Sequence, residues 1–248
     1  MSRLDAESAA RGLVSSRSLA SSMIKNGQVF VNGKAVLRPS FVVKEDDLIE
    51  IHDGELGKYV SRGGLKLEKA LDISGIDVSG AVCCDIGAST GGFTDCLLKH
   101  GAKTVYAVEG GRGQLSPSLL GKDGVVSIEG FNAKELTADT LGEKVDVVVM
   151  DVSFISQTRL YQNVKNVLKD GGKFISLVKP QFEAGKGNVG KNGIVKDEKI
   201  RKQVLKDVTA FAESCGLVCL GTTESPIRGG DGNVEYLAWF MNEVRNEY

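Results

Sequence analysis

Hydrophobic residues in the second part of the chain form short continuous runs separated by segments with a helical period. The runs cover residues 81–86, 104–109, 145–150 and 174–178. Helical spacing of apolar positions occurs in residues 93–98, 158–168 and 197–215. A strand of a parallel sheet is buried on both faces and therefore carries an almost unbroken apolar run, so this alternation predicts a doubly wound α/β sheet. Residues 217–221 and 235–240 are expected to close the sheet as an antiparallel pair.

The first part of the chain predicts a smaller α+β unit that begins with two short helices. The second helical pattern opens at Ser15 and stops at Asn26 and Gly27. Residues 28–31 are then predicted to form a strand that enters a hairpin turn at Asn32-Gly33 and returns at residues 34–36. The change of pattern predicts domains over residues 1–55 and 61–248. Glycines and charged residues in between indicate a linker over residues 56–60.

The composition is that of an ordinary globular protein. The 248 residues include 42% hydrophobic and 25% charged residues, with a formal net charge of -1. Because this charge neither favours nor excludes an anionic partner, any nucleic-acid surface has to be a local patch. No segment approaches the roughly 20 apolar residues of a membrane-spanning helix, and the N-terminus lacks a signal-peptide core. We expect a cytoplasmic protein with no membrane partner.

The cysteines and histidines lack the spacing of a metal site. The five cysteines show no C-x-x-C pair; they are Cys83, Cys84, Cys96, Cys215 and Cys219. We predict that they are buried, reduced thiols. His52 and His100 lie far apart in the sequence and lack a neighbouring cysteine or carboxylate cluster, so we predict surface or loop positions for both and no bound metal.

Charged residues terminate the predicted parallel strands. They are Asp85, Glu109, Asp151 and Lys179. Ligands of open α/β sheets bind at this carboxyl edge. An antiparallel final pair brings Glu235 to the same edge, and Lys66 reaches it from the helix predicted before the first strand. Each charge alone is typical of a solvated surface, but their convergence favours a functional set made of Lys66, Asp151, Lys179 and Glu235.

A glycine-rich turn follows the first of these strands and opens a helix. It reads Asp85-Ile86-Gly87-Ala88-Ser89-Thr90-Gly91-Gly92-Phe93. Its glycines let the backbone approach a ligand closely, and the start of the helix offers free N–H groups. Rossmann dinucleotide sites combine a related turn with an acidic residue on the ribose, a place that Glu109 takes here. The turn therefore does not distinguish NAD from S-adenosylmethionine, and a tight turn without a ligand is a further alternative.

The first part also carries candidate phosphate contacts, which are Arg11, Arg17, Lys25 and Lys34. The acidic residues Glu45, Asp46, Asp47 and Glu50 offset much of this charge. On charge alone, an RNA-binding unit and a solvated unit without a nucleic-acid partner are equally good interpretations. Arg62, four residues before Lys66 on the predicted helix, is a further candidate for RNA contact.

Several motifs carry a family resemblance. Residues 11–34 resemble the S4 RNA-binding domain. The remaining motifs are Ser61-Arg62-Gly63-Gly64-Leu65-Lys66-Leu67, the turn from Asp85 extended to Asp95, Asp151-Val152-Ser153-Phe154-Ile155-Ser156, Val178-Lys179-Pro180-Gln181-Phe182-Glu183-Ala184-Gly185 and Gly232-Asn233-Val234-Glu235-Tyr236. Together and in this order they resemble the TlyA family of ribosomal RNA methyltransferases, whose members are often labelled haemolysin A.

The resemblance implies both fold and activity. It implies an α/β fold with the Rossmann-like sheet of an FtsJ-like, S-adenosylmethionine-dependent methyltransferase. This sheet is mostly parallel, and its last strand is antiparallel. A small N-terminal α+β S4 domain precedes it. The implied reaction methylates a ribose 2′-hydroxyl of cytidine in ribosomal RNA, so ribosomal RNA or ribosomal subunits are the expected partners.

The resemblance also assigns site residues. Lys66, Asp151, Lys179 and Glu235 match the family's catalytic Lys-Asp-Lys-Glu tetrad. The expected cofactor contacts are Asp85, Gly87, Ala88, Ser89, Thr90, Gly91, Gly92, Phe93, Glu109, Asn132 and Asp151, with Asn132 near the adenine. Glu109 stands where the family usually has Asp, and its longer side chain is expected to alter the affinity for the cofactor rather than its identity.

A ribose 2′-hydroxyl becomes a nucleophile only when its proton is removed or polarised. Lys179 is the candidate for this role, and the two carboxylates and Lys66 are expected to orient it. Three other functions compete with this interpretation. A nicotinamide oxidoreductase needs a His or Tyr at the strand edge, a pore-forming haemolysin needs apolar spans or amphipathic barrel strands, and an RNA-binding protein with an inactive methyltransferase domain needs no tetrad.

Overall fold

The structure is a computed structural model that describes residues 1–248 except 15–16, 26, 52–57, 230–231 and 244–248. The chain divides into two compact units, Met1–Gly64 and Leu65–Tyr248. The predicted linker over residues 56–60 begins among residues outside the described part, so its boundaries stay a prediction.

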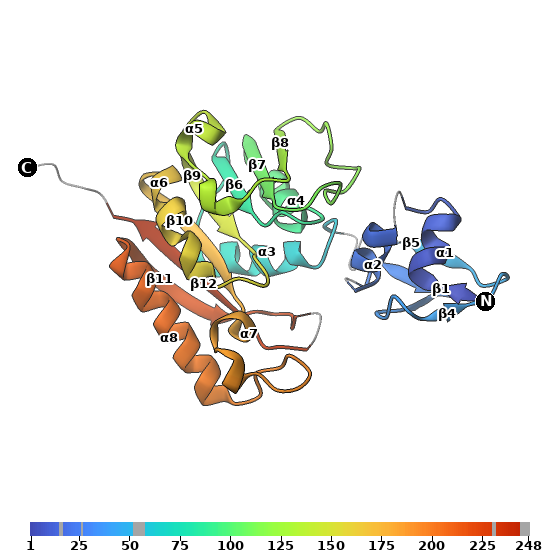
Figure 1. The fold of residues 1–248 in the computed structure, drawn as a ribbon. Coiled ribbons are helices and arrows are strands. Elements are labelled where there is room, and N and C mark those ends of the chain that lie inside the picture. The colour runs from blue at the N-terminus through green and yellow to red at the C-terminus, as the bar shows by residue number, and fades with distance from the viewer. Residues whose placement is uncertain (15–16, 26, 52–57, 230–231, 244–248) are drawn as a thin grey trace, which may run out of the picture. The chain divides into compact units, whose positions relative to one another are not determined.

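The small unit is an α+β fold, as predicted (Figure 1). Its elements are β1 (Ser2–Arg3), α1 (Leu4–Ala10), α2 (Arg17–Lys25), β2 (Val29–Val31), β3 (Lys34–Ala35), β4 (Val42–Val43) and β5 (Ile49–Ile51). β2 pairs antiparallel with β3 and β5, and β1 pairs antiparallel with β4. The predicted hairpin turn is confirmed, because Asn32 and Gly33 have φ values of 50° and 74°, and a tight hairpin requires positive φ at both positions.

The core of this unit joins both helices to the strands. Its buried members are Leu4, Ile24, Val29, Val31, Val43 and Ile49. The alternation of buried and exposed side chains follows from the strand period of two, because successive residues of a strand point to opposite faces. Val29 and Val31 are buried on one face of β2, while Phe30 between them is half-buried.

The large unit alternates strands and helices along the chain. Its elements are α3 (Gly63–Ser74), which begins at the division between the units, β6 (Val82–Ile86), α4 (Gly92–Lys99), β7 (Thr104–Glu109), β8 (Val125–Glu129), η1 (Ala133–Glu135), α5 (Ala138–Leu141), β9 (Val145–Met150), η2 (Gln157–Leu160), α6 (Tyr161–Val167), β10 (Leu168–Val178), α7 (Pro180–Glu183), η3 (Lys186–Asn188), α8 (Glu198–Ser214), β11 (Leu217–Glu224) and β12 (Tyr236–Asn242).

The strands form one seven-stranded sheet in the order β11-β12-β10-β9-β6-β7-β8. The pairs from β8 to β10 are parallel, whereas β12 runs antiparallel to both β10 and β11. This arrangement confirms the predicted doubly wound sheet with an antiparallel final strand. β10 begins at Leu168 rather than at the predicted residue 174, and the register shifts between Leu168 and Lys173. The polar and glycine residues in this irregular stretch conceal the strand in the hydrophobic pattern.

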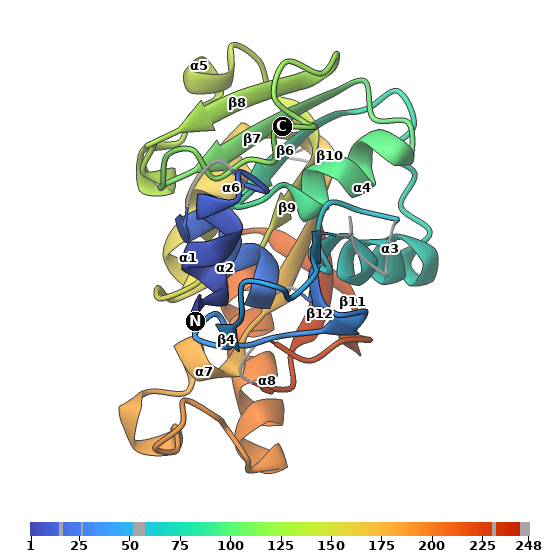
Figure 2. The ribbon, with the colours of Figure 1, turned by 90° about the vertical axis from the view of Figure 1, so that its right-hand side faces the viewer.

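Helices cover both faces of the sheet. On one face, Val164 of α6 and Val208 of α8 belong to a core cluster with strand residues such as Ile86, Phe174 and Phe240. Figure 2 shows α3 and α4 together on the opposite side of the sheet from α6. No helix in the described ranges has the length and hydrophobicity needed to span a membrane.

The order of the strands creates the place for a ligand. β6 lies at the centre, and the chain continues from it first to β7 on one side and later to β9 on the other. Ligands of open α/β sheets bind where the direction of winding reverses, outside the carboxyl ends of the strands. The segments after β6, β7 and β9 therefore surround the expected site.

Candidate active site

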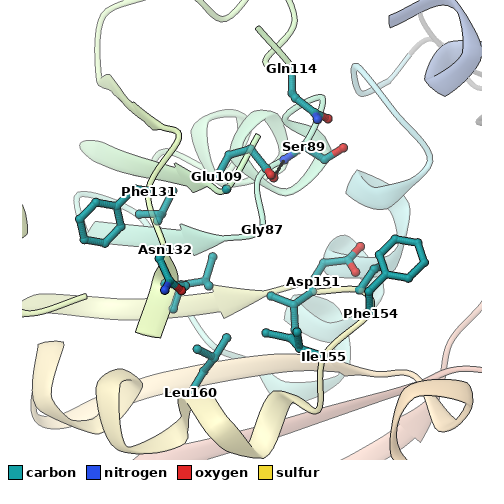
Figure 3. A pocket seen from close by; sticks show the side chains of 16 residues that line it. Gly87, Ser89, Glu109, Gln114, Phe131, Asn132, Asp151, Phe154, Ile155 and Leu160 are labelled. Atoms are coloured by element: carbon teal, nitrogen blue, oxygen red, sulfur yellow. Dashed lines mark hydrogen bonds between the residues drawn. The ribbon is translucent and has the colours of Figure 1, made fainter. Parts of the chain in front are cut away.

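A pocket of about 420 Å³ lies at the carboxyl ends of β6, β7 and β9 (Figure 3). Gly87 and Ser89 line it from the turn after β6, Glu109 from the end of β7, and residues 151–155 from the segment after β9. This volume is within the range of small-molecule and cofactor sites. The pocket therefore occupies the place that the strand order predicts.

The glycine-rich turn brings the backbone close to the neighbouring segment. Gly87 has φ +84°, and a Cβ at this position would collide with the carbonyl oxygen of Asp151. The backbone N–H of Asp151 donates to the carbonyl of Ile86 at 3.0 Å, which extends the β6–β9 pairing to the pocket. A residue with a side chain would open this junction, because both its φ value and its Cβ are incompatible with the site.

Glu109 joins the turn to the loop after β7. Its carboxylate accepts the backbone N–H groups of Ser89 at 2.9 Å and Gly111 at 2.8 Å, one on each oxygen, and Figure 3 shows the first of these contacts. A carboxylate oxygen has two lone pairs, so each oxygen retains one that can accept from a ligand hydroxyl. Glutamate at this position can therefore hold the backbone and a ribose at the same time.

One wall of the pocket is apolar and ends in an amide. Val108, Phe131, Ile155 and Leu160 line this wall together with Asn132. The Asn132 Oδ1 accepts the N–H of Lys134 at 3.2 Å and so caps η1. An apolar slot next to a carboxylate and an amide has the chemistry that an adenosyl group requires, which is a flat apolar base beside a polar ribose.

The second half of the site contains Lys179, which follows β10. Its Nζ forms an ion pair with Oδ1 of Asp151 and donates to Ser153 Oγ at 2.9 Å. Asp151 and Ser153 also line the pocket, so the lysine amine is attached to the pocket wall. Charge-assisted contacts of this kind fix the position of the amine better than a neutral hydrogen bond does.

A second ion pair lies at the same edge of the sheet. Lys66 Nζ lies 2.6 Å from Oε2 of Glu235, and the two side chains are 11% and 3% exposed. The register pairs Val178 with Tyr236, so Lys179 and Glu235 are the next residues at the edge shared by β10 and β12. The four residues that the sequence predicted to converge thus lie at the carboxyl edge as two ion pairs.

Glu129 at the end of β8 supports the loop that lines the pocket at Gln114. Its carboxylate accepts three backbone N–H groups, from Gly113 at 2.8 Å, Gln114 at 2.9 Å and Leu115 at 3.2 Å. Burial acts to raise the pKa of Glu129, but these three hydrogen bonds outweigh it and lower the pKa. Gln114 lines the pocket, so Glu129 fixes the loop that closes this side.

Asp85 occupies a different environment from the other strand-end residues. Its side chain is fully buried, Thr94 Oγ1 donates to its Oδ2 at 2.7 Å, and its Oδ1 accepts no hydrogen bond from any described residue. Burial raises the pKa of this carboxyl to about 7, against the opposing effect of the Thr94 hydroxyl. Asp85 supports the turn from beneath and does not line the pocket.

The structure separates the predicted cofactor residues into two groups. Those that line the pocket are Gly87, Ser89, Glu109, Asn132 and Asp151. Those that lie buried in the turn, in β6 or in α4 without lining the pocket are Asp85, Ala88, Thr90, Gly91, Gly92 and Phe93. The second group shapes the turn, and direct cofactor contact by its members stays a prediction.

The predicted RNA contacts of the small unit also differ from one another. Arg11 pairs with Glu7 at 2.9 Å and donates to three backbone carbonyls in residues 44–47, so it is committed to holding that turn. Arg17 contacts Asp5 at 3.2 Å. Lys25 and Lys34 are exposed, while the Nη2 of Arg62 donates to the Lys25 carbonyl at 3.1 Å.

The cysteines and the described histidine are partly as expected. Cys83, Cys84 and Cys96 are buried free thiols, whereas Cys215 and Cys219 are only half-buried, which corrects the prediction for these two. Cys215 follows the end of α8 and Cys219 lies in β11 at the edge of the sheet, where the side chains are only partly covered. His100 is half-buried at the end of α4, with Nδ1 2.8 Å from the Cys96 carbonyl oxygen. His52 lies outside the described residues, within which no cluster of three metal-ligating side chains occurs.

Sequence reasoning missed several residues of the site. Ser153, Gln114 and Phe131 line the pocket, and Glu129 holds the loop beside it. Ser153 is part of a motif that the family resemblance contains, so its position next to Asp151 was an available signal. Gln114 and Glu129 are brought together only by the pairing of β7 with β8, which the hydrophobic pattern does not fix.

Comparison with known proteins agrees with both units. Residues 59–242 match the family model of FtsJ-like methyltransferases, and residues 2–49 match that of the S4 domain. Hemolysin A of Brachyspira hyodysenteriae is 45% identical over 240 residues, which is 96% of this chain and 99% of the relative. The 16S/23S rRNA (cytidine-2′-O)-methyltransferase TlyA of Mycobacterium tuberculosis is 39% identical over 98% of this chain and 90% of the relative.

A solved structure is similar over almost the full length. A Streptococcus thermophilus protein described as a possible hemolysin superposes with a TM-score of 0.78 at 40% identity, covering 99% of this chain and 90% of that one. The motifs, the sheet order and the matched relatives therefore agree. The chain belongs to the FtsJ-like methyltransferases, in the branch with an N-terminal S4 domain that includes the TlyA proteins.

Proposed function

We propose that this methyltransferase uses S-adenosylmethionine to methylate the ribose 2′-hydroxyl of a cytidine in ribosomal RNA. The observation that carries the proposal is the position of Lys179. Its amine forms an ion pair with Asp151 and a hydrogen bond with Ser153, and both of these residues line the pocket. The relative TlyA of Mycobacterium tuberculosis is named for this reaction, and the S4 domain supports an RNA substrate.

The pocket residues fit the proposed cofactor. Glu109 would accept from the ribose hydroxyls, and Asn132 with the apolar wall around Phe131 would hold the adenine. S-adenosylmethionine supplies, when bound, a methyl group attached to a positively charged sulfur. The turn at Gly87 and Ser89, which approaches Asp151 closely, would line the place of the cofactor together with Asp151.

The two lysine–carboxylate pairs at the carboxyl edge would prepare the ribose 2′-hydroxyl as the nucleophile. A ribose hydroxyl attacks poorly until its proton is withdrawn or polarised, and Lys179 is the group placed to contact it. Asp151 and Ser153 hold the Lys179 amine, and the register of β10 and β12 places Glu235, which is paired with Lys66, next to Lys179 along the backbone. In-line approach to the methyl group then depends on how firmly these contacts fix the amine.

The small unit would bring the RNA to this site. Lys25 and Lys34 are exposed, so they are the better phosphate contacts, because Arg11 is engaged by the turn over residues 44–47. Neutralising phosphates releases counterions, so each lost contact lowers affinity and the dependence on salt. A Lys34→Ala variant is expected to bind rRNA more weakly with a shallower salt dependence.

The test is transfer of labelled methyl to unmodified small and large ribosomal subunits, followed by mapping of the modified nucleotide. We expect label on a cytidine 2′-oxygen with the wild-type protein and a loss of labelling with Lys179→Ala. If the wild-type protein binds cofactor but labels neither subunit, the proposed substrate is wrong. If Lys179→Ala labels at nearly the wild-type rate, the proposed role of Lys179 is wrong.

A further inference from the structure

Within the segment over residues 151–157, residues 151–155 form one wall of the pocket, in a conformation that needs support. Phe154 has φ +67° and an 89% exposed residue surface, so its own side chain does not bury enough surface to hold it. A bulky residue at positive φ is strained, and such strain persists only where the surroundings fix the backbone. The adjacent Asp151, Ser153 and Ile155 all line the pocket.

The short helix α7 (Pro180–Glu183) and the residue before it contact this segment at both ends. Lys179 holds its start through Asp151 and Ser153. At its far end, Glu183 Oε2 accepts from Ser156 Oγ at 2.7 Å, and Oε1 accepts the backbone N–H of Gln157 at 2.9 Å.

An aromatic contact and the buried side-chain amide of Gln157 also hold this segment against α7 and β10. The ring of Phe182 lies 5.3 Å from that of Phe154, centroid to centroid. Gln157 is 2% exposed, and its Oε1 accepts from Tyr161 OH at 3.0 Å and from Ser176 Oγ of β10. The end of the segment is thus fastened to the strand whose next residue is Lys179.

We infer that Glu183 is a positioning residue for methyl transfer, which holds the Asp151–Gln157 wall against α7 and so keeps Asp151 and Ser153 in place around Lys179. This inference rests on the proposed function for its catalytic consequence. Glu183 is not among the residues that line the pocket. It acts through two hydrogen bonds that an uncharged apolar side chain cannot make.

The consequence for the rate follows from the geometry. Misplacement of a catalytic group by about 1 Å can reduce a rate by about a hundredfold. Removal of Glu183 takes away two of the hydrogen bonds that hold the end of the segment next to its strained residue, whereas Glu109 and Asn132 lie outside this segment and are untouched. The rate of transfer from the saturated complex should therefore fall more than the affinity for cofactor.

The test compares Glu183→Ala with Glu183→Gln and with the control Glu198→Ala. The control removes an exposed glutamate that pairs with Lys202 on the surface of α8. We expect Glu183→Ala to lower the single-turnover rate by about ten- to a hundredfold, with the affinity for S-adenosylhomocysteine changed less than about threefold. Glutamine can accept the Gln157 N–H and donate to Ser156, so it should recover most of the rate. Glu198→Ala should leave the rate unchanged.

Hydrogen exchange of the peptide over residues 151–160 provides a readout that does not depend on the reaction. We expect faster exchange of this peptide in Glu183→Ala and wild-type exchange in Glu198→Ala. A Glu183→Ala protein with wild-type rate and wild-type exchange overturns the inference. If Glu183→Ala and Glu198→Ala lower the rate by the same factor, the inference is overturned as well, because the loss is then not specific to Glu183. If the wild-type protein methylates no RNA, the proposed function fails, and the exchange result alone then supports or overturns the positioning role.

Discussion

The two sides of the carboxyl edge are built in different ways. On the cofactor side, formed by the ends of β6, β7 and β8, the carboxylates of Glu109 and Glu129 accept backbone N–H groups of the loops around them. On the lysine side, formed by the ends of β9 and β10, the start of β12 and helix α3, the carboxylates of Asp151 and Glu235 pair with lysines.

This difference separates two tasks. Backbone held by glycines and carboxylates forms a rigid cradle whose shape decides what binds. Lysines held by ion pairs offer groups that can contact a reacting hydroxyl. Substitutions on the cofactor side should therefore change stability and affinity, whereas substitutions on the lysine side should change the rate of methyl transfer.

The largest expected effect tests the lysine side. Lys179→Ala should lower the rate of methyl transfer by about 10²- to 10⁴-fold, the range that general acid–base groups contribute. Affinity for S-adenosylhomocysteine should change by less than about threefold, because Glu109 and Asn132 are untouched. Single-turnover labelling and calorimetry measure the two quantities. A large loss of cofactor affinity would show that the two sides are not separate.

The next effect tests the junction between the sides. Gly87→Ala forces a side chain into a φ of +84° against the Asp151 carbonyl, so it should lower the free energy of unfolding by about 3 kcal/mol. Gly113→Ala is the matched control, because Gly113 has φ +63° with open space around it, and about 1 kcal/mol is expected. Urea denaturation compares them, and equal losses would contradict the tight approach at Gly87.

A third effect concerns the buried carboxyl beneath the turn. The folded-state pKa of Asp85 is raised to about 7, so the unfolded chain loses this proton at lower pH than the folded protein does. The contribution of Asp85 to stability is therefore largest at low pH and is lost as the pH rises through about 7. Asp85→Asn should be more stable than wild type at pH 8 by about 2 kcal/mol, and this advantage should shrink at pH 5.

Urea denaturation of both proteins at the two pH values measures this difference. The asparagine Oδ1 can still accept from Thr94, so the variant retains this hydrogen bond and loses the charge, while its Nδ2 takes the place of the carboxylate oxygen that has no partner. An advantage of the same size at pH 5 and pH 8 would contradict a titrating Asp85.

The smallest effect tests the loop on the cofactor side. Glu129→Gln leaves one acceptor and adds donors opposite the N–H groups of residues 113–115, so cofactor affinity should fall about fivefold, or about 1 kcal/mol. The control is Glu143→Gln, where the exposed glutamate accepts from Tyr106 OH away from the pocket lining. Calorimetry with S-adenosylhomocysteine compares the affinities of the two variants. An unchanged affinity in Glu129→Gln would contradict a role of the loop over residues 113–115 in cofactor binding.

The sequence was informative where local chemistry decides the structure. Continuous apolar runs located β6, β7 and β9, and Asn32-Gly33 located the hairpin, because both signals act within a few residues. The polar strand ends also indicated where Asp151 and Lys179 meet. The division of the four tetrad residues into two ion pairs needed the tertiary structure, since side-chain partners depend on distances between separate strands.

Other features were hidden for similar reasons. The irregular start of β10 contains glycines and charges that interrupt the apolar pattern. Asp85 follows the same strand pattern as Glu109, yet one is fully buried and the other lines the pocket. The register aligns Asp85 with Ala107, so Glu109 lies two residues closer to the carboxyl edge of the sheet. The hydrogen bonds of Glu129 and Glu183 join segments that no local pattern connects.

The most direct test of the division between the two sides measures cofactor affinity and saturated transfer rate in Lys179→Ala and Glu129→Gln under the same conditions. We expect opposite results. Lys179→Ala should transfer methyl slowly but bind the cofactor normally, whereas Glu129→Gln should bind the cofactor weakly but transfer methyl at nearly the wild-type rate once saturated. If both variants lose affinity and rate in the same proportion, the carboxyl edge acts as one undivided site, and the proposed division into a cofactor side and a lysine side is wrong.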